Sequence, residues 1–309
     1  MSSKLKKILL VNSFLLLLLA LYLGISSFFA SEVVEFRKFS LVEDQKRLDN
    51  LTFQSLGLPR PEDFSFQNGP VTLKAWYFKN PKPKKCGVLL LHGYGRTRWS
   101  VLKYSPLFWK RGCDIFAFDH RRHGESGGAY GTFGFYEKFD LENGIDTFSD
   151  ISQIPENKIG VLGESYGAAT ALMTMGLGKK VAFVIADSPY SDMETIVTKK
   201  GVDIYGPIVR LFAPMALFIA GKKADFDPED VSPKKYAASI EVPVLLIHSN
   251  TDAYTPFAHS QIIYDEIQNS QKKIFITDWG AEHGKSINKD YAKYEAIVDG
   301  FLKEFIPSF

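Results

Sequence analysis

Cysteine is scarce in this chain of 309 residues. Its two cysteines, Cys86 and Cys113, are too few for a disulfide framework. Each lies shortly before a motif that should stand at a strand end, so the two could pair if those strands are neighbours in register. A side-by-side bridge within a parallel sheet is geometrically awkward, however. We therefore expect two buried thiols that behave as small apolar side chains.

An excess of one charge sign is also absent. The chain has 37 basic and 35 acidic residues, which gives a net charge of +2. Nucleic-acid-binding proteins normally carry a basic surplus on one face, so we expect no nucleic-acid partner. The glycine-rich loops lack the G-x-x-x-x-G-K-[ST] form that cradles phosphate. Neither internal repeats nor low-complexity segments occur beyond one leucine run.

The amino-terminal segment carries no charge from residue 8 to residue 30, and residues 15–19 are all leucine. A helix of this length would span about 34 Å, enough for the hydrocarbon core of a bilayer. A signal peptide has a shorter apolar region and a small-residue cleavage site, whereas Phe28-Phe29-Ala30 has a bulky side chain where a small one is needed. We therefore expect residues 1–31 to be a retained anchor rather than a cleaved signal peptide. Lysines before the run and glutamates after it predict that the main domain lies outside the cell membrane.

Residues 32–309 are expected to form one α/β domain. Short, wholly apolar runs alternate with stretches that suit helices, which is typical of a mostly parallel sheet covered on both faces. Asn68-Gly69 predicts a hairpin turn before this alternation begins. The predicted strands are residues 63–66, 71–78, 87–91, 114–118, 158–162, 181–185, 242–247 and 274–276.

One long stretch interrupts the alternation. No obvious strand occurs in residues 190–241, where we expect a helical cap over the sheet edge. Within it, residues 204–220 are apolar nearly all round, interrupted by two prolines and Arg210. Two interpretations stay open, namely a hydrophobic lid over an acyl-binding cleft and a buried pair of helices.

The segment Gly163-Glu164-Ser165-Tyr166-Gly167 has the form G-x-S-x-G. It stands between a strand-like run and the helix-like residues 168–173. In that context the serine occupies a strained turn at the top of the sheet, and both glycines are needed because the strand end and the helix start nearly collide. Serine is a weak nucleophile near neutral pH and needs a base, which in turn needs an acid. Ser165 is the predicted nucleophile.

Three histidines after Ser165 are candidate bases, because the chain order in this kind of sheet is serine, acid, histidine. His248 lies in a predicted strand, and His259 follows it along the chain. His283 stands in a loop between the last strand and the last helix, where an imidazole can lean over the serine. We predict that His283 is the base.

The acid should follow a strand that precedes this histidine. Asp252 lies in the loop after the strand at residues 242–247 and is favoured over Asp187, which follows an earlier strand. An oxyanion also needs two donors. We predict the backbone N–H of Tyr166, directly after the serine, and that of Tyr94 in the glycine-rich loop after the strand at residues 87–91.

Together these motifs resemble the α/β-hydrolase superfamily from Asp63 to the carboxyl terminus. His92-Gly93-Tyr94-Gly95 is similar to its oxyanion loop, and residues 119–126 are similar to the motif that follows its fourth strand. Many relatives have glycine where Arg122 stands. Gly134-x-x-Glu137-x-x-Asp140 also resembles the branch of bacterial hydrolases named after lysophospholipases and serine aminopeptidases, whose members often carry an amino-terminal anchor.

This resemblance implies a twisted sheet of about eight strands in which only the second is antiparallel. It also implies a triad of Ser165, Asp252 and His283, structural roles for His120 and His123, and neither a metal nor a cofactor. We therefore predict a membrane-anchored serine hydrolase that cleaves a small-molecule ester, carboxylesterase-like or lysophospholipase-like. The alternatives are an aminopeptidase-like enzyme that cleaves a peptide with the same triad, and a non-catalytic anchored binding protein.

Overall fold

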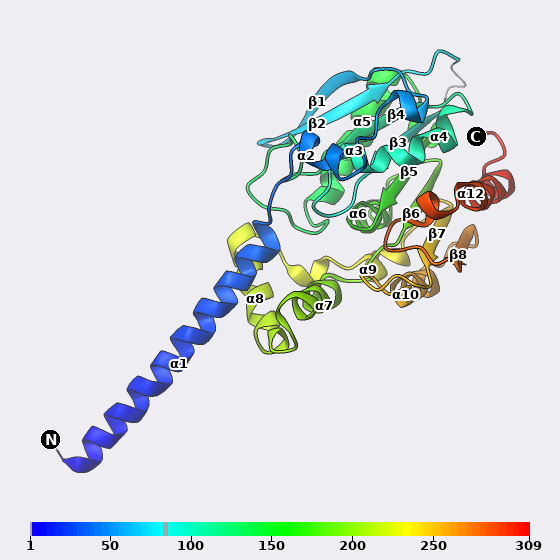
Figure 1. The fold of residues 1–309 in the computed structure, drawn as a ribbon. Helices are drawn as coiled ribbons and strands as arrows, with labels where there is room; N and C mark the ends of the chain where they lie inside the picture. The colour runs from blue at the N-terminus through cyan, green and yellow to red at the C-terminus, as the bar shows by residue number, and fades with distance from the viewer. Residues whose placement is uncertain (1, 83–85) are drawn as a thin grey trace.

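The computed structural model describes residues 2–82 and 86–309. A long helix projects from a body in which helices cover both faces of a sheet (Figure 1). In chain order the helices and strands are α1 (Ser3–Val34), α2 (Leu41–Lys46), β1 (Glu62–Asn68), β2 (Val71–Phe78), β3 (Gly87–Leu91), α3 (Arg98–Val101), α4 (Ser105–Trp109), β4 (Asp114–Phe118), α5 (Glu137–Ser152), β5 (Ile159–Glu164), α6 (Tyr166–Gly176), β6 (Phe183–Asp187), α7 (Met193–Tyr205), α8 (Val209–Ala224), α9 (Pro233–Ala237), β7 (Val244–Ser249), α10 (Ala258–Glu266), β8 (Lys272–Thr277), α11 (Ser286–Lys289) and α12 (Tyr291–Phe305). The 3-10 helices are η1 (Gln54–Leu56), η2 (Leu102–Tyr104), η3 (Glu156–Lys158) and η4 (Pro228–Asp230).

The strands of the described chain form one eight-stranded sheet in the order β1-β2-β4-β3-β5-β6-β7-β8. Strand β2 is antiparallel to both of its neighbours, and the remaining pairs are parallel. The predicted sheet, with only its second strand antiparallel, is therefore confirmed. Asn68 pairs with Val71 across the expected hairpin. Strand β7 begins only after Pro243, which has no N–H to donate to a ladder.

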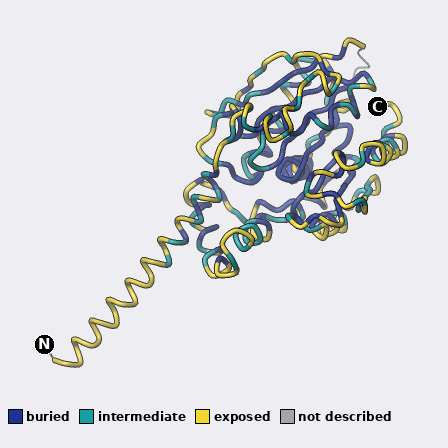
Figure 2. The backbone as a smooth tube through the Cα atoms, in the orientation of Figure 1, coloured by how far each residue is buried: buried dark blue, intermediate teal, exposed yellow. Residues whose placement is uncertain are grey.

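The central strands are apolar because both faces of the sheet are covered. Leu89 and Leu91 on β3 belong to a cluster that includes α5 and α6 residues, whereas Val88 and Leu90 belong to a second cluster with α4 and α12. Successive strand residues thus point into opposite layers. Figure 2 shows the interior of the body as buried and most of α1 as exposed, and β3, β4, β5, β6 and β7 are buried along their whole length.

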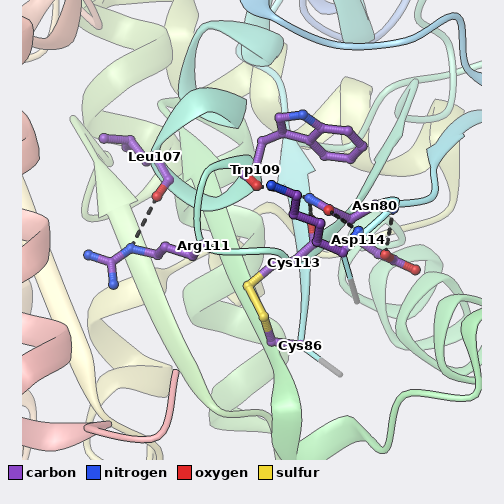
Figure 3. The surroundings of a disulfide bond; sticks show 8 residues. Asn80, Cys86, Leu107, Trp109, Arg111, Cys113 and Asp114 are labelled. Atoms are coloured by element: carbon purple, nitrogen blue, oxygen red, sulfur yellow. Dashed lines mark hydrogen bonds between the residues drawn. A yellow bond between two sulfur atoms is a disulfide. The ribbon is translucent and has the colours of Figure 1, made fainter. Parts of the chain in front are cut away.

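The expectation of two free thiols is wrong, because Cys86 and Cys113 form a disulfide (Figure 3). Their Cα atoms are 4.6 Å apart. Cys86 directly precedes β3 and Cys113 directly precedes β4, and Gly87 lies opposite Asp114 in this parallel pair. A bridge is awkward between positions inside a parallel ladder, but both cysteines precede the first paired residues of their strands, where their side chains can turn toward each other.

The cap contains α7 and α8, and α8 lies beside α1 (Figure 1). Tyr22 stacks on Phe212 with ring centroids 5.3 Å apart, and the Lys223 ammonium lies 2.6 Å from the Glu35 carboxylate. The two helices therefore run side by side in the same direction. The cap is not the buried helix pair of the second interpretation, because its large exposed side chains are Ile204, Tyr205, Ile208, Leu211 and Phe218.

Helix α1 is long and apolar enough to cross a membrane. Its most apolar window has a mean hydropathy of 2.6, and none of that window is buried against the rest of the protein. At its end, Ala30 and Val34 are buried against the body. The helix is therefore free along most of its length and docked at its carboxyl end.

Candidate active site

Ser165 occupies a sharp turn between β5 and α6. Its backbone has φ 53° and ψ −109°, a conformation that non-glycine residues rarely adopt. A Cβ atom at Gly163 would collide with the backbone of Gly167, and one at Gly167 would lie 2.5 Å from the carbonyl oxygen of Leu91. Both glycines are thus required by close backbone approach. The turn places the serine at the carboxyl edge of the parallel strands, where α/β sheets bind ligands.

The structure brings the three predicted triad side chains together. His283 Nε2 lies 2.8 Å from Ser165 Oγ, and His283 Nδ1 lies 2.6 Å from Asp252 Oδ2. Asp252 stands in the loop after β7 and His283 in the loop after β8. A carboxylate that accepts from Nδ1 leaves Nε2 free to receive the serine proton. The geometry is that of a nucleophile with its base and the group that orients the base.

Asp252 is buried and held from several sides. Its Oδ1 accepts the N–H groups of Tyr254 at 2.9 Å and Thr255 at 2.8 Å. Burial by itself would raise the pKa of this carboxyl, but hydrogen bonds with His248 and His283 outweigh burial and hold the pKa below its ordinary value. The group therefore remains a carboxylate, as an orienting acid must.

His248 is a neighbour of the acid that the sequence did not indicate. Its Nε2 lies 3.2 Å from Asp252 Oδ2 and 2.7 Å from the Thr255 carbonyl, and its Nδ1 lies 2.7 Å from Ser260 Oγ. The side chain is fully buried behind the acid. Its position at the end of the strand before Asp252 is the signal in the sequence that places it near the acid.

The rival acid and the remaining histidine are engaged elsewhere. Asp187 Oδ2 accepts the hydroxyl groups of Tyr104 at 2.8 Å and Tyr294 at 2.9 Å. Burial and the nearby Glu164 charge raise the pKa of Asp187. His259 Nδ1 lies 2.8 Å from a serine hydroxyl on the segment before α7.

The two predicted oxyanion donors flank the serine from different elements. Tyr94 lies in the loop after β3, and Tyr166 is the first residue of α6, at the positive end of the helix dipole. Within the described residues, neither backbone N–H donates a hydrogen bond. Gly95 N–H donates to His123 Nε2 at 3.2 Å, and this hydrogen bond holds the loop that contains Tyr94 against His123. Burial lowers the pKa of His123 to about 3, so this ring is neutral and can accept.

The Gly134-x-x-Glu137-x-x-Asp140 motif makes a hydrogen bond to Tyr166, the residue that follows Ser165. Glu137 accepts the Gly134 N–H and the Tyr166 hydroxyl, each at 2.8 Å. Asp140 forms a bidentate ion pair with a neighbouring arginine. Arg122 adopts φ 65°, the left-handed conformation that glycine adopts most readily.

A cavity of about 570 Å³ opens in front of the serine. Several of its lining residues were not predicted. The Tyr254 ring lies 4.7 Å from the His283 ring, and Lys103 forms an ion pair with Glu164. Lys200 reaches the cavity from α7. No group of His, Cys, Asp or Glu side chains suited to a metal ion occurs in residues 2–82 and 86–309.

This sheet order, with a serine turn after β5, defines an α/β hydrolase. The sequence profile of the prolyl oligopeptidase family matches residues 128–307, more than half of the chain. The chain therefore belongs to the prolyl oligopeptidase family and is a serine hydrolase. YqkD of Bacillus subtilis (strain 168) is 33% identical over 218 residues, which cover 70% of each chain. YfhR of Escherichia coli (strain K12) is 24% identical, over 79% of this chain and 81% of its own.

Solved structures share the fold. The Pyrococcus furiosus esterase Pf2001 superposes with a TM-score of 0.67 at 25% identity and covers 83% of this chain and 96% of its own. Pyrococcus horikoshii acylaminoacyl peptidase has a TM-score of 0.62 at 20% identity. The match covers 82% of this chain but only 42% of the peptidase, and it shows the fold alone.

Proposed function

We propose that this protein cleaves carboxylic esters through a covalent acyl-enzyme on Ser165. The observation that carries the proposal is the hydrogen-bonded series from Ser165 through His283 to Asp252 at the edge of the sheet. The likeness to the Pf2001 esterase supports an ester substrate. No cofactor takes part in this chemistry.

In the proposed reaction, Ser165 Oγ attacks the ester carbonyl while His283 Nε2 accepts its proton. Asp252 stabilises the imidazolium that forms, and the N–H groups of Tyr94 and Tyr166 hold the negative carbonyl oxygen. The C–O bond to the alcohol then breaks, and the alcohol leaves with the proton from His283. A water molecule, deprotonated by the same histidine, attacks the acyl group and releases the carboxylic acid and free Ser165.

We further propose that α1 is a retained anchor and that the catalytic domain lies outside the cytoplasmic membrane. The apolar surface of α1 supports a membrane partner. The Cys86–Cys113 disulfide supports the outer side, because disulfides persist in oxidising compartments.

A peptidase is the second candidate function. The family name favours it, and the same triad can attack an amide carbonyl. A cleavable peptide would have to enter the same cavity in front of Ser165. A non-catalytic binding protein does not fit a chain that belongs to a family of serine hydrolases, and it would have no physical need for these three side chains in hydrogen-bond contact.

The test compares p-nitrophenyl butyrate with aminoacyl p-nitroanilides, using the full chain in detergent. We expect ester hydrolysis and fluorophosphonate labelling, both lost in Ser165→Ala and retained in Ser239→Ala, an exposed serine outside the site. Asp252→Asn should lower kcat by about 10⁴-fold, because the asparagine favours the wrong imidazole tautomer. Hydrolysis of the anilides alone would favour the peptidase, and labelling that persists in Ser165→Ala would rule out this nucleophile.

A further inference from the structure

A second cavity, of about 110 Å³, lies between the end of α1 and the cap helices α7 and α8. Tyr94 and Lys200 line both this cavity and the catalytic cavity, so the two spaces adjoin across these side chains. The remaining lining residues are Phe29, Glu32, Val33, Val197, Gly201, Ile204, Tyr205, Val209, Ala213 and Ala216.

The chemistry of this wall is that of an alkyl-chain site. Aliphatic and aromatic side chains supply nearly all of it, and Glu32 and Lys200 are its charged members. Small-molecule sites are typically apolar with a few polar groups at one end. Because Tyr94 and Lys200 also line the catalytic cavity with Ser165, the polar terminus of an apolar chain in this cavity would lie at the side next to that cavity.

The outer edge of the cavity lies at the surface beside α1. Ile204 and Tyr205 line the cavity and are also exposed. The Tyr205 ring lies 5.1 Å from the Phe29 ring and 6.3 Å from the Phe28 ring. These phenylalanines stand at the carboxyl end of the charge-free run of α1, where a helix that spans a bilayer leaves the hydrocarbon.

The cap surface next to this edge is also apolar. Leu211 lies beside Tyr22, whose hydroxyl donates to the Leu211 carbonyl at 3.2 Å. The side chains of Ile208, directly before α8, and of Leu211 and Phe218 on α8 are exposed, and α8 packs beside α1, so exposed apolar side chains occur on both helices. A membrane spanned by α1 would thus surround the edge of the cavity with lipid.

We propose that this cavity, here called the anchor–cap cavity, binds the acyl chain of a single-chain ester lipid that enters from the bilayer. The chain lies between α1, α7 and α8, the ester carbonyl reaches Ser165, and the polar head remains in the catalytic cavity. The anchor helix is thereby part of the substrate site. This inference rests on the proposed ester hydrolysis.

The test measures kcat/KM for p-nitrophenyl acetate and p-nitrophenyl laurate with the full chain in detergent. Ala213→Phe puts a ring into the anchor–cap cavity from α8. Since each methylene withdrawn from apolar contact weakens binding, we expect the laurate-to-acetate ratio of kcat/KM to fall by about tenfold or more. Ala238→Phe, at an exposed position after α9, should leave the ratio as it is in the wild type.

A second variant keeps the test decisive if Ala213→Phe does not fold. Ile204→Asp sits at the exposed edge, buries no new group and places a carboxylate where a chain would enter. It should lower the same ratio and also the hydrolysis of laurate ester supplied in phosphatidylcholine vesicles. An unchanged ratio in the folded variants would overturn the proposal. Absence of any Ser165-dependent ester hydrolysis in the wild type would instead overturn the proposed function itself.

Discussion

At the scale of single residues, Lys200 stands out because its charge is partly buried without an acidic partner. Its ammonium lies 3.9 Å from the centre of the Tyr94 ring and 5.4 Å from that of Tyr254. The ring faces offer it a modest attraction. Burial lowers the pKa of Lys200 to about 8, and no described carboxylate raises it again. The side chain is thus held in the catalytic wall at a cost in stability, as residues at functional sites often are.

We expect Lys200→Met to raise the free energy of unfolding. The ordinary pKa of 10.5 applies to the unfolded chain, whereas the folded pKa is about 8. The unfolded state therefore binds the extra proton between these values, so Lys200 costs stability fully below pH 8 and progressively less as the pH rises toward 10.5. With allowance for partial exposure, the gain at pH 7 should be about 1–2 kcal/mol, shrinking at higher pH.

Urea denaturation of both proteins at pH 7 and at pH 9.5 checks this expectation. The control is Lys199→Met, which removes a neighbouring lysine that pairs with Asp203 at 2.6 Å. An exposed pair of this kind contributes at most about 1 kcal/mol, so the control should show a small loss or no change. Equal gains in the two variants would show that the burial of Lys200 is not the cause.

The sequence predicted the residues whose place depends on strand order. Ser165, Asp252 and His283 each follow a strand, and the carboxyl ends of parallel strands meet at one edge. Lys200 and Tyr254 could not be predicted as lining residues. The position of Lys200 depends on how α7 folds back over that edge, and no local pattern in the chain records this. Tyr254 lies in the loop after β7, where the sequence does not show which way a side chain points.

At the scale of elements, the disulfide joins the starts of two adjacent strands in the sheet. Its cysteines are separated by 27 positions, so replacing both with alanine should lower the free energy of unfolding by about 3 kcal/mol through the larger entropy of the unfolded chain. Denaturation of the wild type in dithiothreitol should show a loss of the same size. Dithiothreitol should leave the double variant unaffected, and a double variant as stable as the oxidised wild type would contradict the expectation.

Element type was predictable wherever periodicity and turn chemistry agreed, as in β3, β5 and the serine turn. Two features could not be predicted from periodicity and turn chemistry. The sequence does not mark the residue at which a ladder begins, and this boundary decided that Cys86 and Cys113 could pair. Nor does an apolar run at residues 204–220 reveal which surface it meets, and in the structure part of that surface is α1.

At the scale of the whole molecule, α1 is fastened to the catalytic body at its carboxyl end. Gly131 N–H donates to the Val34 carbonyl at 3.0 Å, and the Arg122 guanidinium donates to the Glu35 carbonyl at 3.0 Å. Directly after the helix, the Phe36 ring packs 4.5 Å from the ring of Tyr94, in the proposed oxyanion loop. The carboxyl end of the proposed anchor is therefore in direct contact with loops at the catalytic edge of the sheet.

The proposed orientation of this assembly across the membrane rests on charge and redox chemistry. Lysines before the apolar run favour an amino terminus inside the cell, and the disulfide favours an oxidising space for the body. In bacterial cells we expect the protein to resist alkaline extraction from membranes and its domain to be digested by protease added to spheroplasts. Replacement of Lys4, Lys6 and Lys7 with glutamate should reduce that digestion, because it removes the positive charge that favours an amino terminus inside the cell. The control replaces Lys289, Lys293 and Lys303 with glutamate and should leave the digestion as it is in the wild type. Release by alkaline washing would point to a cleaved signal peptide, and a wild-type domain protected in spheroplasts would place the active site in the cytoplasm.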